Sequence, residues 1–171
     1  MRRAFTLIEL IIVVGIIGFL VALIMPSFGT WRERTVVQST ARDIESILKL
    51  ARSKSLASEG GAKYGVQFIT GSAWYQLCKN APPSASCDKF INEYDVPSAL
   101  SFCADTTVVF SKLTGEYENL DPSADLGTIY FYNKNKTANP CSQPSAIVAC
   151  LTAKTCGGVT ITKSGIIYEV Q

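Results

Sequence analysis

Residues 5–25 read FTLIELIIVVGIIGFLVALIM, an almost unbroken apolar run in which Glu9 carries the one formal charge. As an α-helix, with a rise of about 1.5 Å per residue, this run is roughly 31 Å long, and a hydrocarbon core is about 30 Å thick. We therefore expect a transmembrane helix over residues 5–26. An ionised carboxylate costs about 2.5–3.5 kcal/mol at mid-bilayer, so Glu9 needs a partner or a place near the interface.

Length and composition limit the number of domains and the classes of function that the rest of the chain can have. The 171 residues leave room for one further domain of ordinary size. The formal charge of +2 belongs to Arg2 and Arg3, and the remainder is balanced, which argues against a general attraction to nucleic acid. Without His or a phosphate-binding glycine loop, no motif supports catalysis, so we expect a protein that is not an enzyme and uses no cofactor.

The cysteines all follow the apolar run. Their even number and the absence of His favour disulfides over a metal site, and structural free thiols are the alternative. Disulfides place the domain outside the cytoplasm. We expect Cys78 to pair with Cys87 across a short, turn-prone segment, and the pairing of the other four stays open. The candidates are Cys78, Cys87, Cys103, Cys141, Cys150 and Cys156.

The short positive segment before the apolar run favours a cytoplasmic N-terminus. The junction MRRAFTLIEL, residues 1–10, resembles the leader junction of type IV pilins and type II secretion pseudopilins. The resemblance implies that residues 1–4 are a leader peptide. A prepilin peptidase would cut between Ala4 and Phe5 and methylate the new N-terminus at Phe5. Ala4 departs from the Gly that is usual before the cut.

The resemblance also implies assembly roles within the helix. Glu9 would pair with the amine of Phe5 in a neighbouring subunit, because a charge pair in a low-dielectric bundle offsets desolvation. The alternative is a hydrated Glu9 near the interface. The segment between Gly18 and Pro26 would unwind or kink in assembled pili, whereas an ordinary membrane helix with tolerated glycines and a terminal proline is the other interpretation.

Residues 27–60 form the amphipathic second half of the helix, which we expect to run to about Ser58 and to stop at Gly60-Gly61. Apolar residues spaced by three and four predict one stripe facing a core, and exposed pairs join Arg42 to Glu45 and Glu45 to Lys49. The stripe consists of Val37, Ala41, Ile44, Leu48 and Ala51.

Residues 61–171 predict a β-rich extracytoplasmic domain with disulfides. Alternation over residues 64–68 and 73–78 across Gly71-Ser72 predicts a hairpin, and residues 158–162 and 166–170 predict a second. Shorter runs at 107–111 and 128–132 predict further strands, and residues 80–86, 121–125 and 133–143 are rich in turn residues. The expected fold class is α+β, a long N-terminal helix packed on an antiparallel sheet domain.

A second resemblance concerns residues 50–68, LARSKSLASEGGAKYGVQF, and the terminal hairpin ITKSGIIYEV. Both resemble the H-type minor pseudopilins of type II secretion and the FimT-like minor pilins. This implies a structural subunit, stored as a single-pass protein in the cytoplasmic membrane and then assembled into a type IV pilus or secretion pseudopilus. Its partners would be prepilin peptidase, other pilin or pseudopilin subunits and an inner-membrane assembly platform.

Three alternative functions stay open: a major type IV pilin, a DNA-binding minor pilin in DNA uptake, and a membrane-anchored domain that never polymerises. Asp121 and Asp125 are weak calcium candidates, although a solvated turn explains them better, so we expect no metal. The run of residues 130–132 beside Lys134 and Lys136 could stack on nucleic acid, but alternation directs Phe131 to a core. We do not expect a nucleic-acid partner.

Overall fold

The computed structural model describes residues 6–79, 87, 89–118, 126–136 and 139–170, and of residues 23–30 it describes the backbone alone. The chain divides into two compact units, Met1–Thr35 and Val36–Gln171. The boundary falls inside helix α1, Leu7–Leu56, so one helix contributes to both units. The second unit holds the sheets and the core.

The expected stripe on the second half of α1 is confirmed. Its five side chains are at most 4% exposed, because the three-and-four spacing puts them on one face of the helix. At the end of the helix, the backbone N–H of Tyr64 donates a hydrogen bond of 2.8 Å to the buried Ser55 Oγ. This bond ties the last turn of α1 to the first strand, across the 3-10 helix η1, Glu59–Gly61.

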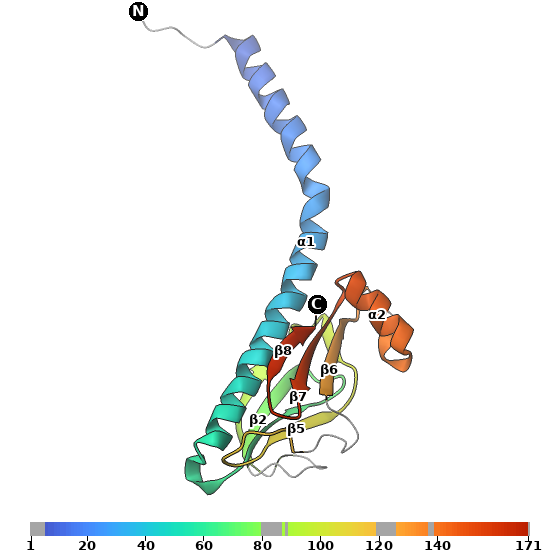
Figure 1. The fold of residues 1–171 in the computed structure, drawn as a ribbon. Coiled ribbons are helices and arrows are strands. Elements are labelled where there is room, and N and C mark those ends of the chain that lie inside the picture. The colour runs from blue at the N-terminus through green and yellow to red at the C-terminus, as the bar shows by residue number, and fades with distance from the viewer. Residues whose placement is uncertain (1–5, 80–86, 88, 119–125, 137–138, 171) are drawn as a thin grey trace, which may run out of the picture. The chain divides into compact units, whose positions relative to one another are not determined.

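Two antiparallel four-stranded sheets make up the domain (Figure 1). The first sheet has the order β3-β2-β1-β5, and the second has the order β4-β6-β7-β8. The strands of the first sheet are β1 Tyr64–Phe68, β2 Trp74–Lys79, β3 Lys89–Asp95 and β5 Thr106–Phe110. Those of the second are β4 Leu100–Phe102, β6 Leu126–Asn133, β7 Cys156–Thr162 and β8 Ile167–Val170.

Both expected hairpins form, as the β1–β2 and β7–β8 pairs. Sequence reasoning missed β3, β4 and the helix α2, Pro144–Thr152, which contacts β7 and is preceded by the 3-10 helix η2, Pro140–Ser142. β3 has no buried side chain to give an alternating pattern, and β4 is only three residues long. In α2 only Cys150 is buried, so its apolar residues show no clear helical stripe.

A chain of aromatic contacts joins the two sheets in one core. Phe68 of β1 stacks with Tyr75 of β2 at 5.5 Å between ring centroids, and it meets Phe102 of β4 edge-on at 5.1 Å. Phe102 in turn meets Phe131 of β6 at 6.4 Å. Such pairs add about 0.5–1.5 kcal/mol each beyond the burial of their area. The same core contains the buried stripe of α1.

The charged pairs on α1 differ in part from the expectation. Lys49 Nζ lies 2.6 Å from Glu45 Oε1, as expected for an i,i+4 pair. Arg42 Nε lies 3.5 Å from Glu169 Oε1 on β8. Arg42 was expected to pair with Glu45, but the tertiary fold brings a carboxylate from the other end of the chain to it. In Figure 1, β8 is the strand drawn beside α1.

Candidate assembly site

Helix α1 begins with a reciprocal pair of hydrogen bonds between Thr6 and Glu9. The Thr6 backbone N–H donates to Glu9 Oε2 at 3.2 Å, and the Glu9 backbone N–H donates to Thr6 Oγ1 at 3.3 Å. The Thr6 hydroxyl also donates to Glu9 Oε2, at 3.1 Å. This is a capping box, in which two side chains satisfy backbone donors that a helix N-terminus leaves free. The negative charge of the carboxylate also interacts favourably with the positive N-terminal end of the helix dipole.

This capping role of Glu9 was not predicted from the sequence, where Glu9 was expected to have an intermolecular partner. The signal was available, because Thr6-Leu7-Ile8-Glu9 before an apolar run is the T-x-x-E pattern of a capping box. Glu9 Oε2 accepts both hydrogen bonds from Thr6, and no described residue donates a hydrogen bond to Glu9 Oε1. Ala4 and Phe5, the expected cleavage and methylation positions, lie outside the described residues.

The first unit exposes the apolar side chains of α1. The large hydrophobic side chains between Leu7 and Val21 are 45% to 76% exposed. Within the described part of the chain, no helix combines the length and the hydropathy needed to cross a membrane. An apolar helix surface of this kind is one that another apolar surface can cover.

Helix α1 is continuous through Gly18 and Pro26. Among the described residues, no atom outside the local helix lies within 4 Å of a Cβ built on Gly18, so the glycine leaves open space there on the helix surface. The unwinding expected between these residues concerns an assembled filament and stays a prediction.

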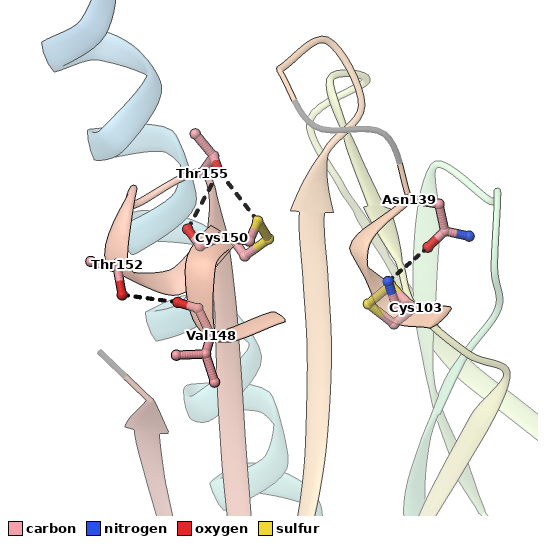
Figure 2. Close-up of a disulfide and its surroundings, with 8 residues drawn as sticks. Cys103, Asn139, Val148, Cys150, Thr152 and Thr155 are labelled. Atoms are coloured by element: carbon pink, nitrogen blue, oxygen red, sulfur yellow. Dashed lines mark hydrogen bonds between the residues drawn. A yellow bond between two sulfur atoms is a disulfide. The ribbon is translucent and has the colours of Figure 1, made fainter. Parts of the chain in front are cut away.

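Three disulfides cross-link the domain. Cys78 on β2 is bonded to Cys87, as expected from the sequence, with a Cα–Cα distance of 5.6 Å. The pairings left open are Cys103–Cys141 and Cys150–Cys156. Figure 2 shows Asn139 beside the first of these bonds, its Oδ1 accepting the Cys141 backbone N–H at 3.0 Å. The second bond joins the end of α2 to the start of β7.

The aromatic run of residues 130–132 is divided between the two faces of β6. Phe131 is 1% exposed and packs in the core, as alternation predicted, whereas Tyr130 and Tyr132 are half-buried. Asp121 and Asp125 lie outside the described residues. Among the residues that the structure does describe, no group of three or more acidic or cysteine side chains could hold a metal ion.

A long N-terminal helix whose second half packs on antiparallel sheets is the pilin-like α+β fold. A crystal structure bears out this class: the type IV minor pilin FimU of Pseudomonas aeruginosa superposes with a TM-score of 0.55 at 16% identity, over 82% of this chain and 92% of that one. The minor pseudopilin EpsH of the Vibrio cholerae type 2 secretion system gives 0.48 at 14%, over 78% and 95%. No family model and no curated protein sequence matches the chain.

Proposed function

We propose that this chain is a structural, non-enzymatic minor subunit that assembles into a type IV pilus or a secretion pseudopilus. The observation that carries the proposal is the likeness to FimU over 92% of that minor pilin. The exposed apolar half of α1 supports it, because a helix of this kind can pack against copies of itself.

The route to the filament follows from the first 26 residues. Prepilin peptidase removes residues 1–4 and methylates Phe5, and residues 5–26 hold the subunit in the cytoplasmic membrane with the domain outside the cytoplasm. An inner-membrane assembly platform then moves the subunit into the filament. The support for these steps is the sequence MRRAFTLIEL and the bilayer-matching length of the apolar run.

Glu9 has two roles in this proposal. Before assembly its carboxylate caps α1 through Thr6, which keeps the charge hydrogen-bonded. In the filament the methylated amine of Phe5 in a neighbouring subunit donates a hydrogen bond to Oε1, while Oε2 continues to accept the hydrogen bonds of the cap. A carboxylate can do both because its two oxygens provide about four acceptor sites.

A pair of variants separates the two roles. Glu9→Gln keeps a side chain that suits a capping box but removes the charge, whereas Thr6→Ala removes the cap hydroxyl and keeps the charge. We expect Glu9→Gln to reach the membrane, be processed and fail to enter filaments, and Thr6→Ala to enter them. Immunoblots of sheared filaments and mass spectrometry of the mature N-terminus measure both. Normal filament incorporation of Glu9→Gln would refute the pairing, and Met1 retained on the mature wild type would refute the processing.

A further inference from the structure

Charge is distributed unevenly over the globular unit, although the whole chain is almost neutral. The stretch from residue 88 to residue 125, which includes β3 and β5, is predominantly acidic. From Leu126 to Tyr168, which covers β6, β7 and α2, the chain contains no Asp or Glu. The charged residues of this second stretch are Lys134, Lys136, Lys154 and Lys163.

The first sheet collects carboxylates at one of its ends, and we call Glu93, Asp95 and Asp105 the acidic end. Glu93 and Asp95 are the last acidic residues of β3, and Asp105 directly precedes β5. All three are exposed. The Thr70 backbone N–H donates to Asp105 Oδ1 at 2.6 Å, which fixes that carboxylate beside the β1–β2 turn. The register places Lys79 opposite Lys89 at the other end of this sheet.

The second sheet has an outward face without charge. Ile129 and Phe131 point into the core, so Thr128, Tyr130 and Tyr132 point outward. Thr128, Tyr130 and Tyr132 are half-buried, and their partners on β7, Thr160, Gly158 and Cys156, are buried. Tyr168 on β8, opposite Thr160, is 42% exposed, so the accessible part of this face consists mainly of tyrosines. Uncharged, tyrosine-bearing surfaces of this kind are typical of the centres of protein interfaces.

Two lysines lie at one end of this uncharged face. The Asn133 backbone N–H donates to Thr155 O at 2.9 Å, which brings the end of β6 to the start of β7 and with it the next residues, Lys134 and Lys154. Both lysines are exposed, and neither forms an ion pair with a described residue. We call Lys134, Lys154 and the uncharged face the lysine-flanked face.

Both surfaces lie toward the same end of the globular unit. The Lys134 backbone N–H donates to Ala99 O at 2.8 Å, and Ala99 belongs to the short connection between Asp95 on β3 and the start of β4. The acidic end on the first sheet and the two lysines beside the second sheet therefore lie at a similar level of the domain. Parallel copies placed side by side would bring an acidic end to the level of a neighbour's lysines.

We propose that the acidic end of one copy binds the lysine-flanked face of a second copy of this chain. The inference rests on the proposed function, since it names a contact between the globular domains of two copies within the assembly. Opposite charges steer and orient the two copies, and the uncharged tyrosine face is covered on contact. The contact is head-to-tail, so a bound pair leaves one surface of each kind free for a further subunit.

Charge reversal on each surface tests the contact. The full-length chain is produced with two different tags in cells without prepilin peptidase, solubilised in mild detergent, and analysed for co-purification at low and high salt. Variant one carries Lys134→Glu with Lys154→Glu, and variant two carries Glu93→Lys with Asp95→Lys. We expect each variant alone to lose about tenfold in self-association, because like charges then face each other.

Mixing the two variants gives the decisive result. In the mixture the unchanged acidic end of variant one meets the unchanged lysines of variant two. The reversed surfaces of the two variants also carry opposite charges, so both contacts between the variants are attractive. We therefore expect co-purification to return only when variant one is mixed with variant two. Lys89→Glu, at the other end of the first sheet, is the matched control and should bind as the wild type does. Wild-type self-association should weaken with rising salt.

Several results would overturn the inference. One is unchanged self-association of both variants, and another is failure of the mixture to restore co-purification. A third comes from testing retention on immobilised double-stranded DNA: if variant one lost only this retention and still self-associated, its lysines would serve a nucleic acid instead of a second copy. The assay precedes leader cleavage and filament entry. Copy-to-copy binding without filaments would therefore reject the proposed function alone, and normal filaments from both variants would reject this inference alone.

Discussion

A Cβ atom built on Gly165 would lie 2.1 Å from the carbonyl oxygen of Gly115, so the β7–β8 turn meets the loop after β5 through bare backbone. Arg52 on α1 holds both segments. Its Nε donates to Gly115 O at 3.1 Å, and its Nη2 donates to Ser164 O at 3.1 Å. One side chain of the helix thus ties a loop of the first sheet to the closing hairpin of the second.

Gly165→Ala should destabilise the domain by more than about 2 kcal/mol, because it adds a steric clash to the cost of a φ of +79°. Gly71→Ala is the matched control, since Gly71 has a φ of +77° and no atom of the described residues lies within 4 Å of its Cβ position. It should cost about 1 kcal/mol, the backbone term alone. Chemical unfolding of the full-length chain in detergent measures both, and equal losses would contradict the steric argument.

Arg52→Lys should lower the free energy of unfolding by about 1 kcal/mol, because a lysine ammonium cannot reach two carbonyl oxygens in the fork geometry of a guanidinium. Arg42→Lys provides the comparison. Arg42 is 71% exposed and forms a single contact with Glu169, so its replacement should change stability by a few tenths of a kcal/mol at most. The same unfolding measurement decides, and a larger loss for Arg42→Lys would count against the bridging role of Arg52.

The two disulfides that the sequence left unassigned should differ in their contribution to stability. Cys103–Cys141 closes a loop with a sequence separation of 38, and Cys150–Cys156 one of 6. Chain-entropy arguments give about 4 kcal/mol for the longer loop and about 2 kcal/mol for the shorter. Replacing each pair by alanines, followed by thermal unfolding, tests this order. A greater loss from removing Cys150–Cys156 would show that local packing outweighs loop closure.

Acid should weaken the domain in part through Asp105. The hydrogen bond from the Thr70 backbone N–H lowers the pKa of this carboxyl below its usual value. The group therefore contributes stability above the unfolded-state pKa of about 3.9, and this contribution is lost as pH falls through the lower folded-state pKa. Asp105→Asn should flatten the fall in unfolding midpoint below pH 4. A titration curve identical to that of the wild type would disprove the contribution.

The long helix and the two hairpins could be predicted because their signals are local. The three-and-four spacing on α1 marks the buried face, and alternation with glycine turns marks β1–β2 and β7–β8. The capping box of Thr6 and Glu9 was equally local and was overlooked. β3 could not be predicted, because all its side chains are at least partly exposed and its pairing with β2 contains a register shift.

By itself, the sequence determined the helix, the hairpins, the Cys78–Cys87 bond and the apolar first half of α1, since each depends on residues close together in the chain. The tertiary structure alone decided that Arg42 meets Glu169, that Arg52 bridges the loop after β5 and the β7–β8 turn, and that Cys103 meets Cys141. It also gathered Glu93, Asp95 and Asp105 at one end of the first sheet and brought Lys134 and Lys154 to one end of the second. These relationships join residues far apart in sequence, and only packing around the shared aromatic core brings them together.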